Sequence, residues 1–184
     1  MKDLTGKNDI RTNKINEGRR KFFENTMAAG ALVAGATLSS NAFAKPSSAT
    51  LTRQVIEPLP WQAGYGFVTG NIISGEHRTF YMAGQGPTDE QGNVLHPNDM
   101  AGQINQTLDN MEKALKEVGM SWSNLVNLAV YTTDMQGFFE VYEQTIYKRV
   151  SVDGGGRFGG SLLQISGFAF PDMKVEIVGH AVSD

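Results

Sequence analysis

The chain contains no cysteine, which excludes a disulfide framework, a thiolate nucleophile, a cysteine-bound zinc and a lipid-modified cysteine. Histidine is scarce as well: the 184 residues hold only His77, His96 and His180, and their spacing pairs none of them on one helix face. We therefore expect no metal and no cofactor. Long apolar runs are also missing, because the run Met27–Leu38 is too short and too rich in small residues for a stable membrane span.

Residues 1–44 combine the parts of an export signal. The basic segment Gly18–Glu24 precedes the short apolar run, and Ala42–Ala44 has the small-x-small pattern that a signal peptidase accepts. The adjacent arginines Arg19 and Arg20, followed by Phe22, resemble a twin-arginine signal. The alternative is a disordered basic tail with an amphipathic helix. We expect cleavage after residue 44, a linker and first strand over 45–58, one domain over 59–184, and a periplasmic protein that folds before export and has no membrane association after cleavage.

Positive charge becomes scarce once this segment is set aside. From residue 45 onward, nine Lys or Arg stand against fifteen Asp or Glu, which leaves a formal charge of −6. Phosphate backbones attract basic surfaces, so this acidic domain is a poor candidate for binding nucleic acid.

Apolar periodicity predicts one long helix over Met100–Val118. Five apolar residues recur at steps of 4, 3, 4 and 3 and draw a single stripe: Ile104, Leu108, Met111, Leu115 and Val118. Asn98 or Asp99 can cap the start of this helix, and Gly119 can end it. The stripe is typical of a helix face that packs on a core.

The remaining elements predict a two-layer α+β domain. Asp134 opens a second helix, whose shared face is formed by Phe139, Tyr142, Ile146 and Val150. After the first strand, five more are predicted: Phe67–Ile73, His77–Ala83, Leu125–Thr132 (covered on both faces), Ser161–Phe168 and Met173–Val182. A hairpin turn over 74–76 joins the first two of these five, which are the second and third strands of the chain. We expect a mixed sheet covered on one face by two helices, with the other face buried by oligomerisation.

The strand end Phe80–Pro87 is a candidate floor for a ligand site. Its first half is aromatic and apolar, and its second half, from Ala83 to Pro87, loses side-chain bulk. A backbone without bulk can approach a ligand closely. The alternative is a glycine-rich turn with no ligand.

In this order, the elements and motifs resemble the RidA family, also called YjgF, UK114 or L-PSP. The similarity covers roughly Pro60–Val182, and it is carried by Tyr81–Pro87, Gly92, Gln103, Asn110, Leu115, Val130–Met135, Phe138 and Phe170–Ile177. The opening Pro60-Trp61 is similar to a family subgroup with a Pro-Trp motif. The resemblance implies a chorismate-mutase-like domain that forms a homotrimer, with small-molecule clefts between subunits.

The resemblance also implies an activity, the hydrolysis of enamines and imines to keto acids and ammonia. Active members hold the substrate carboxylate with an arginine at the start of the penultimate strand, where this chain has Gly160–Leu162. Arg157 is the candidate replacement, or else a solvated loop cation. The family's glutamate falls at Val178, so Glu176 and His180, on the same strand face, are the candidate water-directing groups. The alternatives are a structural carboxylate and a packed histidine.

Four further residues are predicted to bind substrate. Gly84, with Gln85 beside it, matches the glycine that lines the family's cleft, and Tyr65 matches a tyrosine that closes it. Tyr142 stands where an asparagine is common, with packing as its alternative role. The residues leave open a divergent deaminase or a non-catalytic trimer that binds a small metabolite. Carboxylates are among the candidate ligands. Endoribonuclease activity is disfavoured by the charge.

Overall fold

Residues 50–184 are the part of the chain that the computed structural model describes, so the predicted signal peptide lies outside the described residues. Within them, no helix is long and apolar enough to cross a membrane. The elements follow in the order β1 (Thr52–Ile56), the 3-10 helix η1 (Pro60–Tyr65), β2 (Gly70–Ser74), β3 (Arg78–Tyr81), α2 (Met100–Glu117), the 3-10 helix η2 (Trp122–Asn124), β4 (Leu125–Thr132), α3 (Met135–Tyr142), the π-helix η3 (Glu143–Asp153), β5 (Gly159–Gln164) and β6 (Val175–Ser183).

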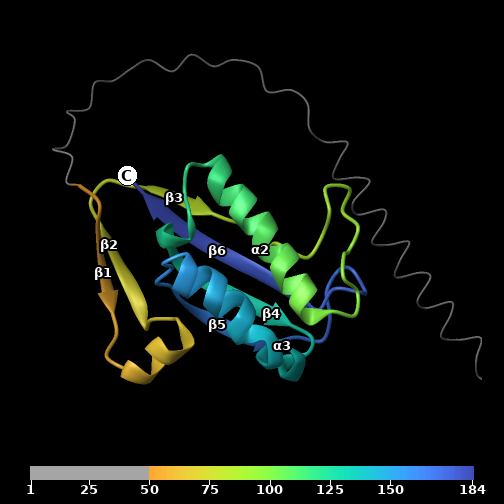
Figure 1. The fold of residues 1–184 in the computed structure, drawn as a ribbon. Helices are drawn as coiled ribbons and strands as arrows, with labels where there is room; N and C mark the ends of the chain where they lie inside the picture. The colour runs from red at the N-terminus through yellow and green to blue at the C-terminus, as the bar shows by residue number, and fades with distance from the viewer. Residues whose placement is uncertain (1–49) are drawn as a thin grey trace, which may run out of the picture. The chain divides into compact units, whose positions relative to one another are not determined.

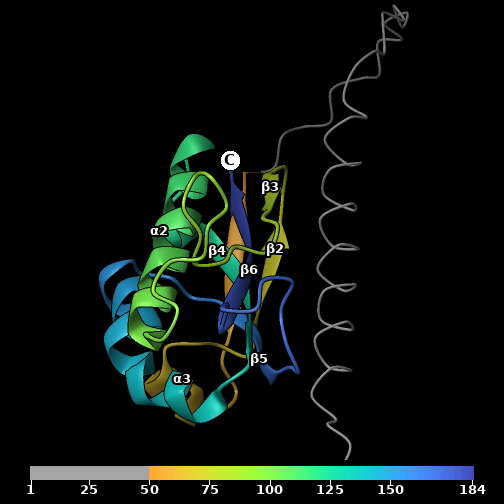
Figure 2. The ribbon, with the colours of Figure 1, turned by 90° about the vertical axis from the view of Figure 1, so that its right-hand side faces the viewer.

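The main sheet has four strands in the order β3-β6-β4-β5. β4 and β5 run parallel, and the other two pairs are antiparallel, so the sheet is mixed, as predicted. Figures 1 and 2 show α2 and α3 together on one face of this sheet. The two-layer α+β architecture predicted from the element order is therefore confirmed.

Strand β4 begins and ends at the predicted residues, but its burial differs from the prediction. Leu128, Val130 and Thr132 are buried against the helices, whereas Ala129 and Tyr131 on the other face are only half-buried. Within one copy of the chain, the prediction that both faces are covered is wrong. The face that points away from the helices is called the outer face below.

Helix α2 forms where the apolar stripe predicts it. Ile104, Leu108, Met111 and Leu115 have no exposed surface, and each such buried side chain contributes roughly 1.5–3 kcal/mol to stability. The Asp99 carboxylate caps the helix by accepting a hydrogen bond from the Gly102 amide at 2.9 Å. The long helix is thus specified by its core stripe and its cap.

The second helix starts at Asp134, as predicted, with the carboxylate accepting a hydrogen bond from the Gly137 amide at 2.9 Å. From residue 143 onward it continues as a π-helix, whose turns are wider than the 3.6 residues of an α-helix. Within α3, Phe138 is buried, at 1% exposed, while its neighbour Phe139 is 56% exposed. Phe139, Tyr142 and Ile146 lie on one side of the second helix, as predicted, but Phe139 is exposed whereas Ile146 is buried.

The prediction that Phe67–Ile73 and His77–Ala83, the second and third strands, form a hairpin is also wrong. β2 pairs antiparallel with β1, and β3 pairs with β6, so the turn between β2 and β3 joins two different sheets. Gly75, at φ 90°, supplies the left-handed residue that the turn needs. Figure 1 shows β1 and β2 side by side, next to one end of the main sheet.

Two side chains fasten the β1–β2 hairpin to the main sheet. Arg53 donates through Nε to Asn71 Oδ1 at 2.8 Å, and through its terminal nitrogens to the carbonyls of Ser123 (2.8 Å) and Leu125 (2.7 Å). Asn71 Nδ2 donates to the carbonyl of Arg157 at 3.0 Å. Burial and the nearby Arg157 guanidinium lower the pKa of Arg53. The hairpin therefore reaches the starts of both β4 and β5.

Candidate functional site

A cavity of about 440 Å³ opens between η1, α3 with the start of η3, and the strands β4 and β5 on the helix-covered side of the sheet. None of its lining residues is charged or a histidine. Seven are aromatic, and the others are apolar or small: Trp61, Tyr65, Phe67, Phe138, Phe139, Tyr142, Phe158, Leu128, Val130, Ile146, Leu162, Gly160 and Ser161.

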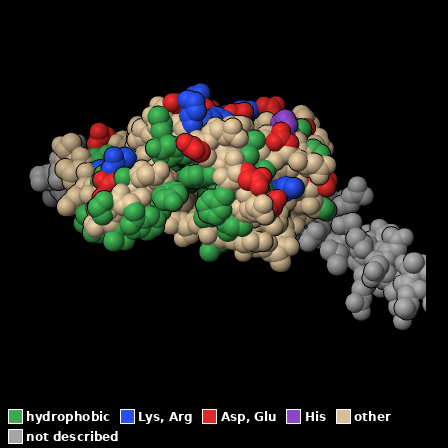
Figure 3. Space-filling model, turned by 60° about the horizontal axis from the view of Figure 1, so that its bottom comes forward, with side chains coloured by type: hydrophobic (Ala, Val, Ile, Leu, Met, Phe, Trp, Pro, Cys, Tyr) green, Lys and Arg blue, Asp and Glu red, His purple; other side chains and the backbone are tan. Residues whose placement is uncertain are grey.

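The cavity has a buried floor and an exposed mouth. The floor includes Phe138, Ile146 and Phe158, all at most 4% exposed. At the mouth, Trp61 and Tyr65 are each more than half exposed, against a typical preference of aromatic rings for burial. Figure 3 looks at this end of the molecule and shows hydrophobic side chains gathered there, with a hollow between them.

The aromatic residues of η1 pack on one another. The Trp61 ring lies edge-to-face against Tyr65 (centroids 6.1 Å apart) and against Phe67 (5.9 Å), a favourable geometry for aromatic pairs. Gly66 ends η1 at φ 74°, so close to Ser151 that a Cβ would not fit. Ser151 Oγ also donates to the Gly66 carbonyl at 2.8 Å. One wall of the mouth is thereby anchored to η3.

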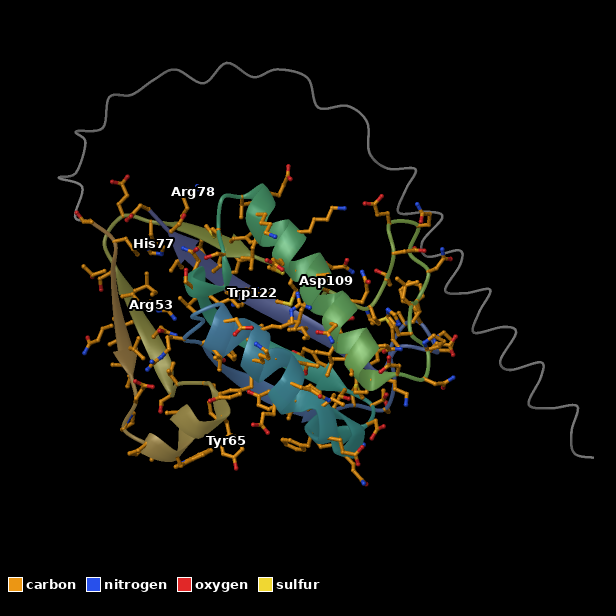
Figure 4. All side chains as sticks on the ribbon, viewed as in Figure 1. Arg53, Tyr65, His77, Arg78, Asp109 and Trp122 are labelled. Carbon is orange, nitrogen blue, oxygen red and sulfur yellow. The ribbon has the colours of Figure 1, made fainter. Side chains whose placement is uncertain are left out.

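Tyr142 connects the two walls of the cavity. Its hydroxyl donates to the Tyr65 carbonyl at 2.6 Å. Burial, with a smaller effect from the nearby Tyr147, raises the pKa of Tyr142 to about 12, so the hydroxyl stays a neutral donor at physiological pH. Figure 4 shows Tyr65 at the η1 end of the molecule. Two of the predicted substrate-binding residues, Tyr65 and Tyr142, are therefore brought together here.

A second group of predicted site residues lies on the outer face of the sheet. The Glu176 carboxylate covers Gly84 so closely that a Cβ added there would displace the carboxylate. No hydrogen bond or ion pair joins this carboxylate to any residue of the described chain. Its neighbour Ile177 is fully buried on the helix side, so strand alternation places Glu176 opposite the cavity. The sheet itself separates Glu176 from Tyr142.

His180 lies on the same outer face as Glu176 but four residues along the strand, and Gln85 belongs to neither arrangement. The His180 ring lies edge-to-face against Tyr81 at 5.1 Å, and its four-residue separation from Glu176 is about 13 Å along a strand. One small ligand would not touch both groups. Gln85 pairs with Ile177 through its backbone, and its side-chain amide donates to the Ala83 carbonyl at 3.1 Å.

Arg157 lies outside the cavity lining. Its guanidinium pairs with Glu57, in the segment between β1 and η1, and its side chain is half exposed. The next residue, Phe158, does line the cavity, and so does the segment 160–162, at the predicted position of the family's arginine. Among residues 50–184, no group of three or more acidic or histidine side chains could hold a metal ion.

Comparison with known proteins assigns the chain to a family. Residues 66–183 match the family model described as Endoribonuclease L-PSP. The chain belongs to the RidA (YjgF/L-PSP) family. Two relatives are named 2-iminobutanoate/2-iminopropanoate deaminase. The rat protein is 30% identical over 99 residues, which cover 54% of this chain and 69% of the relative, and the mouse protein is 35% identical over 71 residues, 39% and 51%.

The RidA-family assignment also accounts for the fold. The Rid-family protein YyfB of Yersinia pestis superposes with a TM-score of 0.62 at 22% identity, over 70% of this chain and 97% of that structure. The chain thus has the chorismate-mutase-like α+β fold that the sequence resemblance implies.

Sequence reasoning missed most of the aromatic lining of this RidA-family cavity. Trp61 was noted only as part of a Pro-Trp motif, and Phe67 was predicted only as the first residue of a strand. Phe138 was singled out only as part of the family resemblance, and Phe158 had no signal of its own, because each adjoins the cavity only through the packing of α3 on β4 and β5.

Proposed function

We propose that this RidA-family protein binds a small organic molecule in the cavity between η1, α3 and β5. The observation that supports this is the cavity itself, a concave site with a buried floor and a volume of about 440 Å³. That volume lies within the usual range for small-molecule sites, roughly 300–1,000 Å³.

We place binding ahead of imine hydrolysis for a reason of charge. A substrate carboxylate in this cavity would meet no cation, and an unpaired buried anion is strongly disfavoured. The segment 160–162 supplies no arginine, and Arg157 pairs with Glu57 instead. The family's carboxylate clamp has no counterpart in the lining.

Imine hydrolysis is the second candidate, and Glu176 favours it. A carboxylate that has no hydrogen-bond or ion-pair partner within residues 50–184 and is held over a glycine is suited to act as a general base toward water. Water would add to the carbon of the C=N bond, and the resulting carbinolamine would release ammonia and leave the keto acid. The deaminase names of the rat and mouse relatives agree with this candidate.

One kinetic assay separates the two candidates. Enamine would be generated from serine or threonine by a dehydratase, and the rate of ammonia release would be followed with and without the purified protein. Binding without hydrolysis predicts the buffer rate. Acceleration that is lost in Glu176→Gln would replace the binding proposal with the deaminase, and acceleration that is lost in Arg157→Ala would assign the clamp to that residue.

We further propose that copies of the chain assemble, as a homotrimer, with a cleft between subunits. The sheet separates Glu176 and Gly84 from Tyr65 and Tyr142, so a site that uses both groups needs a second copy. The half-exposed outer face supports the same proposal. Light scattering coupled to size-exclusion chromatography should give three times the chain mass, and a monomer at micromolar concentration would defeat the proposal.

The place of action that we propose is the periplasm, reached through a twin-arginine signal over residues 1–44. The adjacent arginines, the apolar run and the Ala42–Ala44 pattern support it. Changing Arg19 and Arg20 to lysines should leave the precursor in the cytoplasm. Unchanged delivery to the periplasm would exclude the twin-arginine route.

A further inference from the structure

We infer that the cavity selects an uncharged ligand carrying an apolar ring or branched hydrocarbon group, in preference to a small carboxylate. The inference rests on the proposed function in one respect, that this cavity is the ligand site. It goes further by naming the chemical class of the ligand.

The floor of the cavity is apolar and buried. Phe138, Ile146 and Phe158 present hydrocarbon that is already removed from water, together with the buried Leu128 and Val130 of β4. A ligand that fills this space gains by the removal of its own apolar surface from water. A polar ligand of the same size would lose its hydration and find little to replace it.

The mouth of the cavity is lined by exposed aromatic side chains. Trp61, Tyr65 and Phe139 are each more than half exposed, although large aromatic side chains bring more stability when covered. The edge-to-face packing of Trp61 on Tyr65 and Phe67 holds the rings of η1 in a defined arrangement around the opening. A planar ring entering the cavity would be covered by aromatic side chains on more than one side.

The lining of the cavity has no charged side chain. The lining contains no Lys, Arg or His to pair with an anion, and no Asp or Glu to pair with a cation. The Tyr142 hydroxyl, which could solvate an anion, is already donated to the Tyr65 carbonyl. From residue 45 onward the net charge of −6 also repels anions at longer range. An uncharged ligand is the class that meets none of these penalties.

Two fluorescent probes with the same ring system test the inference. N-phenyl-1-naphthylamine is uncharged, and 8-anilinonaphthalene-1-sulfonate adds one fixed negative charge. In titrations of the full-length protein, we expect the uncharged probe to bind saturably, with one site per chain. The sulfonate should bind at least about tenfold more weakly, because it would bring an unpaired charge into an apolar site.

Neighbouring leucines of β5 give a matched pair of variants. Leu162 lines the cavity, whereas Leu163 does not and is half exposed. Leu162→Trp should fill the cavity and weaken binding of the uncharged probe at least about tenfold, and Leu163→Trp should not. If Leu162→Trp fails to fold, Trp61→Ala at the exposed mouth should weaken binding, with Tyr81→Ala, 74% exposed on β3, as its control.

The outcomes are distinct. Equal or tighter binding of the sulfonate would overturn the inference, and so would binding of the uncharged probe that neither Leu162→Trp nor Trp61→Ala weakens. Thermal shifts with pyruvate and 2-oxobutanoate separate this failure from that of the proposed function. If the keto acids stabilise the protein and the uncharged probe does not bind, the ligand class is wrong while the proposed function stands; if nothing binds, both fail.

Discussion

Removal of one hydroxyl group, in Tyr142→Phe, tests how the two walls of the cavity are joined. The Tyr142 hydroxyl donates to the Tyr65 carbonyl at 2.6 Å, which joins α3 to η1. At pH 7 its loss should lower the free energy of unfolding by about 1 kcal/mol, the typical net value of one hydrogen bond. The uncharged probe should bind more weakly as well, since η1 is then held less firmly.

The pH dependence gives a larger and more specific signal. Burial raises the pKa of Tyr142 to about 12 in the folded protein, against about 10 in an unfolded chain. The folded state therefore keeps a proton that the unfolded state releases, so the contribution is complete below pH 10 and disappears as the pH rises to 12. Two pKa units correspond to nearly 3 kcal/mol, which partial solvent exposure reduces to about 2 kcal/mol.

Urea unfolding followed by circular dichroism, between pH 8 and pH 12, is the measurement. The wild type should lose about 2 kcal/mol more than Tyr142→Phe across the upper two pH units. Tyr81→Phe is the control, because the exposed Tyr81 hydroxyl makes no hydrogen bond within the described residues, and it should follow the wild type. Superimposable profiles for the wild type and Tyr142→Phe would refute the assignment of a buried, raised-pKa hydroxyl.

Three further predictions concern residues around the sheet. The fully buried Gln103 donates to the Asp172 carbonyl (2.7 Å) and accepts from the Lys174 amide (2.8 Å). Gln103→Met should therefore lower the free energy of unfolding in urea by about 2–4 kcal/mol. The control Gln136→Met, at an exposed position, should change this free energy by less than about 0.5 kcal/mol. Gly84→Ala must displace the Glu176 carboxylate, which a lower melting temperature would register and an unchanged one would contradict. Arg157→Ala removes an exposed ion pair and should lower stability by at most about 1 kcal/mol, with unaltered probe binding; lost binding would bring that guanidinium into the site.

The sequence predicted best where one local rule decides the outcome. The apolar stripe of α2 with its Asp99 cap, and the start of α3 at Asp134, follow from side-chain spacing and from hydrogen bonds to neighbouring amides. The family motifs likewise led to the correct fold, because the resemblance covers nearly the whole domain.

The errors arose where the outcome depends on distant partners. A glycine turn at Gly75 looks the same in sequence whether its strands pair with each other or, as here, with β1 and β6. The π-helix from residue 143 onward was not predicted either, nor that Phe138 rather than its neighbour Phe139 is buried in the core. The cavity was out of reach for the same reason, since its walls come from η1, α3 and β5.

The hydrogen bonds that fasten β1 and β2 to the main sheet affect the order in which the chain folds. Arg53 and Asn71 bond to carbonyls that follow them by 55 to 104 residues. Contacts between such remote positions form slowly, because a long loop must close first. A nascent chain that ends before residue 157 lacks one of the carbonyls that fasten β1 and β2 to the main sheet. Among the described residues, β1 is the first strand to be synthesised, but its attachment to the main sheet therefore forms late.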